Sequence, residues 1–143
     1  MAEKVLILGL SKSGIAAAKF AASKGYDVYI TESKGVNEVR RLDNPATPPG
    51  IKGVNPQIEE LKSLGIKIEC GLHSEKFISG SSFAVTSPGI PPKSEIFRRL
   101  NEKNIKIISE IEFAYLNTKT PFIAITGTNG KTTTTALVSH ILS

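Results

Sequence analysis

Short apolar runs alternate with segments of helical spacing along most of the chain. The apolar runs are typical of buried strands and lie at residues 4–8, 27–31, 66–70, 82–86 and 105–108. Between them, apolar residues recur every three or four positions, which predicts helices at residues 15–24, 57–64, 74–78 and 110–116 and another after Ser94. This alternation predicts an α/β domain: a Rossmann-like five-stranded parallel sheet with flanking helices.

Capping residues mark several of the predicted helix ends. Gly25 and Gly65 follow two helical segments, as C-terminal caps do. Ser94 and Ser109 have the side chain of an N-cap, and Glu112 gives Ser109 the spacing of a capping box. Residues 35–55 are rich in proline and weakly periodic, which predicts a long surface loop with room for a short helix at 36–42.

The turn after the first strand resembles the dinucleotide-binding fingerprint with its middle glycine replaced. Gly9 and Gly14 hold the outer positions and Ser11 the middle one. The middle glycine lets a pyrophosphate approach the backbone, so the Cβ of Ser11 argues against the usual NAD or FAD pose. Glu32 follows about 20 residues later, where an acidic side chain can meet a ribose hydroxyl. Any sharp turn favours glycine, so a purely structural role stays open.

Further polar residues follow the ends of the second and fourth strands. Ser33 and Lys34 come directly after Glu32, and Ser87 and Gly89 lie in a proline-rich turn after residue 86. Because the carboxyl ends of parallel strands share one edge, where ligands bind in such sheets, these residues form a candidate site. For the Ser87–Gly89 turn, turn formation alone is an equally good explanation.

A second motif lies near the end of the chain. An apolar run at 122–125 predicts a strand, a helix is predicted at 136–142, and Gly130-Lys131-Thr132 stands between them. This is the build of a phosphate-binding loop, in which backbone N–H groups and a lysine hold phosphates and a hydroxyl holds Mg²⁺. Ile125 stands where the strict pattern has glycine.

The two motifs predict two domains. Residues 1–118 contain enough strands and helices for a complete domain, and residues 117–121 read as a linker. One strand, loop and helix cannot bury their own apolar faces, so residues 119–143 read as the truncated start of a second domain. The unpaired strand at 122–126 then offers a route to self-association.

Composition narrows the function classes. The net charge is +5, but the basic residues are spread along the chain and few aromatic residues lie among them. This pattern argues against a nucleic-acid-binding protein. No apolar run approaches the roughly 20 residues of a membrane span. The single cysteine, Cys70, excludes an internal disulfide, fits a reducing cytoplasm and reads as a small buried apolar residue. His73 reads as exposed or structural, since it is a lone histidine in a loop.

Four motifs together resemble the Mur ligase family, and most closely its D-glutamate-adding member. They are the Gly9–Gly14 turn and residues 86–90, 109–112 and 124–133. The family uses Thr-Gly-x-Asn-Gly-Lys in place of the strict loop pattern, which accounts for Ile125. The resemblance implies that the Rossmann-like domain binds the UDP part of a substrate, not a nicotinamide cofactor.

The resemblance also implies roles for individual residues. Lys12 and Ser13 would bind the UDP-sugar pyrophosphate, Glu32, Ser33 and Lys34 would lie near the uridine, and Ser87 and Gly89 would close the pocket. The ATP-binding residues would be Gly127, Thr128, Asn129, Gly130, Lys131, Thr132 and Thr133. Among them, Lys131 and Thr132 would be catalytic, and Thr132 would hold Mg²⁺.

The implied reaction belongs to peptidoglycan synthesis in the bacterial cytoplasm, and so to cell wall biogenesis, cell shape and cell division. ATP phosphorylates the carboxylate of UDP-N-acetylmuramoyl-L-alanine, and the D-glutamate amine attacks the acyl phosphate to form an amide. The D-glutamate site would lie beyond this chain, so the chain alone is expected to be inactive.

Two other readings stay open. One is a nucleotide- or dinucleotide-binding Rossmann module, against which Ser11 and the second phosphate loop argue. The other is a non-catalytic structural fragment. NADH binding without competition by UDP would favour the first. Residues after 121 that pack on a neighbouring chain would favour the second.

Overall fold

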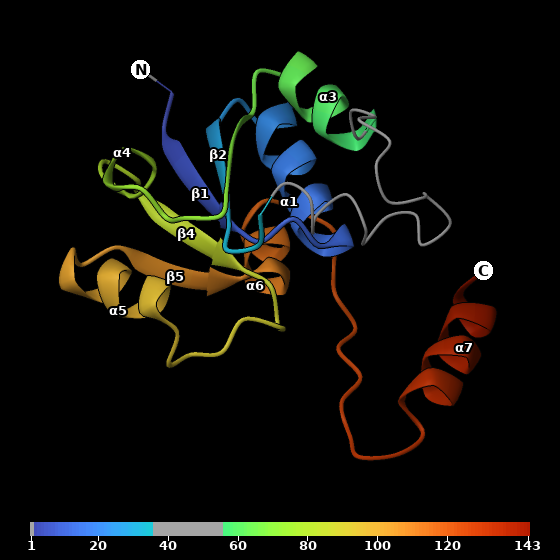
Figure 1. The fold of residues 1–143 in the computed structure, drawn as a ribbon. Coiled ribbons are helices and arrows are strands. Elements are labelled where there is room, and N and C mark those ends of the chain that lie inside the picture. The colour runs from blue at the N-terminus through green and yellow to red at the C-terminus, as the bar shows by residue number, and fades with distance from the viewer. Residues whose placement is uncertain (1, 36–55) are drawn as a thin grey trace, which may run out of the picture.

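A five-stranded parallel sheet forms the centre of the computed structural model, which describes residues 2–35 and 56–143 (Figure 1). The strands are β1 Lys4–Leu8, β2 Asp27–Glu32, β3 Lys67–Cys70, β4 Phe83–Thr86 and β5 Lys106–Ser109. They lie in the order β3-β2-β1-β4-β5, and every neighbouring pair is parallel. The predicted sheet is confirmed. The predicted loop at 35–55 and its helix at 36–42 lie outside the described residues, apart from Gly35.

Helices cover both faces of the sheet. On one face lie α1 Lys12–Ser23, α3 Pro56–Ser63 and α6 Glu110–Leu116, and on the other α4 Glu75–Ile78 and α5 Glu95–Glu102 (Figure 1). None of the helices within residues 2–35 and 56–143 is long and apolar enough to cross a membrane.

The core is divided between these two faces by the alternation of side chains along β1. Val5 and Ile7 pack with α1, α3 and α6, whereas Leu6 and Leu8 pack with α4 and α5. All four are buried, because a central parallel strand is covered on both sides. The apolar run at the start of the chain therefore marks the middle of the sheet.

Serine caps set the beginnings of the helices that flank the candidate site. The α1 helix begins at Lys12 rather than at residue 15, because Ser11 takes the N-cap position and its Oγ accepts a hydrogen bond from Gly14 N at 3.2 Å. Ser109 caps α6 as predicted, with Glu112 N donating to its Oγ at 3.1 Å. Ser94 stands at the N-cap of α5, but its hydroxyl makes no capping bond.

The end of the chain departs from the prediction. The strand expected at 122–125 is wrong: residues 121–130 have no helix or strand. A strand needs a partner for its backbone groups, and within the described residues no strand pairs with this segment. Helix α7, Lys131–Leu142, begins at Lys131 rather than at residue 136, buries none of its residues and stands apart from the sheet (Figure 1).

Candidate functional site

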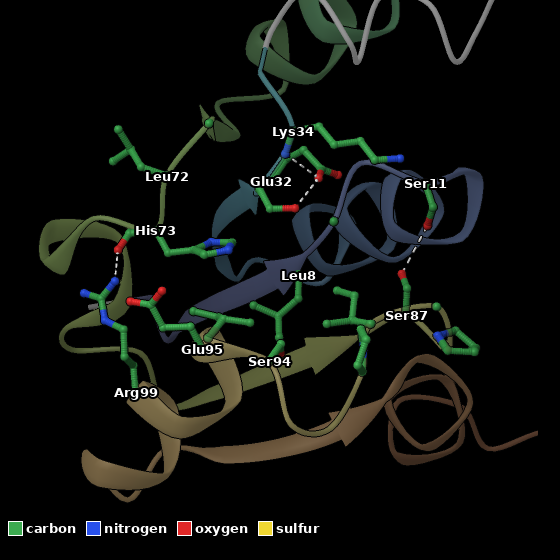
Figure 2. A pocket seen from close by; sticks show the side chains of 18 of the residues that line it. Leu8, Ser11, Glu32, Lys34, Leu72, His73, Ser87, Ser94, Glu95 and Arg99 are labelled. Carbon is green, nitrogen blue, oxygen red and sulfur yellow. Dashed lines mark hydrogen bonds between the residues drawn. The ribbon is translucent and has the colours of Figure 1, made fainter.

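A cavity of about 840 Å³ opens at the carboxyl edge of the sheet (Figure 2). This volume lies within the range of ligand pockets, about 300–1,000 Å³. The predicted residues that line it come from three different segments, the start of α1 and the ends of β2 and β4: Ser13, Glu32, Ser33, Lys34, Ser87 and Gly89. Lys12 is exposed and is not among the lining residues. The structure therefore brings together most of the residues that the sequence predicts at this edge.

The glycine turn brings the amino end of α1 against the end of β1. Gly9 has a φ of +93°, which L side chains rarely adopt, and a Cβ on Gly14 would stand 2.3 Å from Gly9 O. Both glycines are therefore required by the backbone. The first turn of α1 carries no acidic residue, so no side-chain charge within it offsets the positive end of the helix dipole, which suits an anion.

A chain of hydroxyl groups links this turn to a carboxylate on α6. Ser87 Oγ donates to Glu110 Oε1 at 2.5 Å, and Ser87 Oγ lies 3.1 Å from Ser11 Oγ. Ser11 Oγ in turn lies 3.1 Å from Ser13 Oγ. Ser87 is buried, so its hydroxyl belongs to this internal chain.

The Glu32 carboxylate connects two turns of the site by hydrogen bonds. Glu32 is 9% exposed. One carboxylate oxygen accepts a hydrogen bond from Leu10 N at 2.9 Å, and the other accepts from Lys34 N at 3.0 Å and from Ser33 Oγ at 3.2 Å. The carboxylate thus ties the turn after β1 to the turn after β2. The Lys34 side chain is free of these bonds and extends toward the turn that holds Ser11 (Figure 2).

The other end of the cavity is formed by residues that the sequence did not assign to the site. They are His73, Ser94, Glu95 and Arg99, with apolar walls from Leu8, Leu72, Ile90 and Ile96. Figure 2 shows the His73 ring and the Glu95 carboxylate on the same side of the cavity. The sequence could have placed His73 at the site, because this residue follows β3 and so lies at the same carboxyl edge of the sheet. No sequence pattern places Arg99 at the site, because it lies in the middle of α5.

His73 is held in place and neutral. Its Nδ1 lies 2.7 Å from Thr31 Oγ1, and Arg99 donates a hydrogen bond to its backbone oxygen. Burial, and then the positive charge of Arg99, lower the pKa of His73 below 6.5. The neutral ring therefore lines the cavity at pH 7 without adding charge. Near it, Ser94 Oγ is buried and has no hydrogen-bond partner among the described residues.

Cys70, predicted to be a small buried apolar residue, is only in part covered by its neighbours. It packs against the buried cluster that includes Val28, Ile30 and Leu61. Burial raises the pKa of its thiol, and the nearby carboxylates of Glu32 and Glu69 raise it further. A thiol with a raised pKa is a poor nucleophile at neutral pH.

The predicted ATP-binding residues lie away from this cavity. Lys131 Nζ bonds to the carbonyl oxygens of Gly127 and Thr128, so the loop folds around the lysine. Gly127 and Gly130 have positive φ values, and Thr132 and Thr133 stand exposed in the first turn of α7. The ATP-binding role of this loop stays a prediction. In residues 2–35 and 56–143 no three His, Cys, Asp or Glu side chains gather into a metal-binding cluster, and Thr132 stays the predicted Mg²⁺ ligand.

Comparison with known proteins agrees with this architecture. Residues 3–109 match the family model described as Mur ligase MurD-like, N-terminal domain. The chain belongs to the Mur ligase family. The UDP-N-acetylmuramoylalanine--D-glutamate ligase of Cytophaga hutchinsonii is 42% identical over the whole chain, and that of Streptococcus mutans is 38% identical over 99% of it. The chain spans 28% of the length of each of these relatives.

A solved Mur ligase relative shares the fold. The pseudomurein peptide ligase type C of Methanothermus fervidus has a TM-score of 0.61 and 25% sequence identity, over 98% of this chain and 26% of that one. The matches to these sequences and to this structure extend across the predicted linker at 117–121. The Mur ligase resemblance that the motifs indicate is thus confirmed.

Proposed function

We propose that this chain is the UDP-substrate-binding part of an ATP-dependent Mur ligase that adds D-glutamate to UDP-N-acetylmuramoyl-L-alanine in peptidoglycan synthesis. The observation that carries the proposal is the cavity at the carboxyl edge of the sheet, which joins the anion-binding end of α1 to a partly apolar lobe. A nucleoside diphosphate has the matching parts: a charged diphosphate and a flat ring. The family match over residues 3–109 supports the same assignment.

The diphosphate would bind at the glycine turn. The backbone N–H groups of Lys12 and Ser13 lie in the first turn of α1, where helix geometry leaves them without an intrahelical partner, and Ser13 lines the cavity. Lys34 adds a positive charge that reaches toward this turn (Figure 2). Lys12 would contribute its backbone rather than its side chain, which does not line the cavity. Ser87 and Gly89 would close the pocket from the opposite loop.

The nucleoside would occupy the space beyond Glu32. The hydrogen bonds from Ser33 Oγ and Lys34 N to this carboxylate hold both residues at the edge of the cavity. There they would contact the uridine. The lobe beyond them offers apolar faces together with the neutral His73 ring. Such a mixture suits a base that is apolar on its faces and polar on its edge.

Residues 119–143 would begin the central ATP-binding domain, after a first domain at residues 1–118. ATP with Mg²⁺ would supply the phosphoryl group that activates the substrate carboxylate. Lys131 would exchange its contacts with the carbonyls of Gly127 and Thr128 for ATP phosphates, and Thr132 would hold Mg²⁺. Self-association through 122–126 and a location in the bacterial cytoplasm remain predictions of the sequence.

Binding of UDP tests the proposal. We expect UDP to shift the amide resonances of the Gly9–Gly14 turn in an NMR titration, and NADH not to do so. Lys34→Ala is expected to weaken UDP binding roughly twofold to fivefold, the size of a partly hydrated charge contact. Lys119→Ala, which removes the same charge from the linker, should leave the affinity unchanged. No shift of the turn at millimolar UDP, or a shift with NADH that UDP does not reverse, would overturn the proposal.

The isolated chain is expected not to ligate. The chain spans 28% of the length of the relatives that it matches, and the family resemblance would place the D-glutamate site in the remainder. ADP release in the presence of ATP, Mg²⁺, UDP-N-acetylmuramoyl-L-alanine and D-glutamate should stay at the background measured with Lys131→Ala. Turnover above that background would show that residues 119–143 carry more of the catalytic machinery than we expect.

A further inference from the structure

We propose that Glu110 is a positioning residue for the diphosphate-binding turn, a role that rests on the proposed function. Glu110 opens α6 and is not among the residues that line the cavity. Its carboxylate nevertheless accepts the shortest bond of the hydroxyl chain, from Ser87 Oγ at 2.5 Å. Through Ser87 and Ser11 the carboxylate is connected to the first turn of α1.

The carboxylate sets the direction of every bond in this chain. An ionised carboxylate can only accept, so it takes the single hydrogen of the Ser87 hydroxyl. Ser87 Oγ can then only accept from Ser11, across 3.1 Å. Because the single hydrogen of Ser11 Oγ is then donated to Ser87, Ser11 Oγ can only accept from its other neighbours, and it accepts a hydrogen bond from Gly14 N at 3.2 Å. The hydrogen atoms of Ser11 and Ser87 therefore both point toward Glu110.

This direction leaves one hydroxyl able to donate to a ligand. Ser13 Oγ lies 3.1 Å from Ser11 Oγ and is at the free end of the chain. Because Ser11 already accepts from Gly14, Ser13 can turn its hydrogen to an anion in the cavity without leaving Ser11 unsatisfied. Glu110 thus acts at the far end of the chain to keep the turn arranged as a set of donors.

Removing Glu110 would release the direction. The Ser87 hydroxyl could then donate to Ser11. The Ser11 hydroxyl would turn its own hydrogen away from Ser87 and toward Ser13, on the side from which the Gly14 N–H donates. The N-cap bond at Gly14 and the diphosphate-binding turn would both weaken. A ligand that lacks phosphates would not sense the change.

Two variants on one helix turn test this proposal. Glu110→Ala is expected to speed hydrogen exchange at the Gly14 amide about fivefold and to weaken UDP binding by a similar factor, the loss of about one hydrogen bond. Binding of uridine should be unchanged. Glu112→Ala removes the same charge from the same turn, where Glu112 pairs with Lys106 on the surface at 3.3 Å, and should change none of these quantities.

A double-mutant cycle distinguishes positioning from a general structural effect. If Glu110 acts through Ser87, then Ser87→Ala and Glu110→Ala together should weaken UDP binding no more than either alone. Glu110→Gln keeps an oxygen that accepts from Ser87, so its affinity should stay within about twofold of the original. Additive losses, or equal losses of UDP and uridine affinity, would overturn the proposal.

The two proposals fail in different ways. Absence of UDP binding to the unaltered chain would refute the proposed function, yet the Gly14 exchange rate in the free chain would still decide the role of Glu110. Conversely, unchanged exchange at Gly14 and an unchanged ratio of UDP to uridine affinity in Glu110→Ala would refute the positioning role while UDP binding stood.

Discussion

Replacing Gly14 by alanine is expected to destabilise the domain by about 3 kcal/mol or more, at the upper end of the cost of overpacking. The added Cβ would stand 2.3 Å from Gly9 O and 3.3 Å from Gly9 C, and both are backbone atoms. Gly9 cannot retreat freely, because its N–H donates to Thr31 O at 2.9 Å. Alanine favours a helix over glycine by about 1 kcal/mol, which the clash exceeds.

Urea unfolding followed by circular dichroism measures this effect. Gly89→Ala is the matched control, since a Cβ there meets nothing within 4 Å and the residue has no positive φ. Its free energy of unfolding should change by less than about 0.5 kcal/mol. Equal stabilities for the two variants would mean that the turn at Gly14 relaxes easily, and that the close approach of α1 to β1 is not required.

Much of the fold could be predicted from the sequence because it depends on local patterns. The buried run that becomes β1 and the alternating helices gave the element types, and Ser109 marked the start of α6. The order of the strands could not be predicted in this way, because periodicity says which residues are buried and not which strands are neighbours. The strand expected at 122–125 failed for the same reason, since pairing depends on a partner outside the segment.

The candidate site likewise contains residues that local patterns predicted and residues that only long-range packing brings together. Glu32, Ser33, Lys34 and Ser87 were found because each follows a predicted strand and therefore lies at a known edge. The hydrogen bond between Ser11 and Ser87 joins residues 76 positions apart, so no local pattern indicates it. The roles of Glu110 and Arg99 became visible only with the packing of α6 and α5, which bring their side chains to the turn and to His73.

Phe113→Ala is expected to cost about 3–5 kcal/mol, the usual range for deleting a buried phenyl ring. Phe113 is 1% exposed and lies at the centre of an aromatic group, with ring centroids 5.8 Å from Phe20 and Phe83 and 5.9 Å from Tyr26. These rings come from α1, from the loop before β2 and from β4. The ring is therefore the main contact that fixes α6 against the rest of the domain.

Ile111→Ala on the same helix provides the control, because this side chain is 78% exposed. Its free energy of unfolding should change by less than about 0.5 kcal/mol in the same denaturant experiment. Since Phe113 holds the helix that carries Glu110, Phe113→Ala should also speed exchange at the Gly14 amide under native conditions, and Ile111→Ala should not. A destabilised Phe113→Ala variant with unchanged Gly14 exchange would show that Glu110 keeps its bond to Ser87 without the packing of α6.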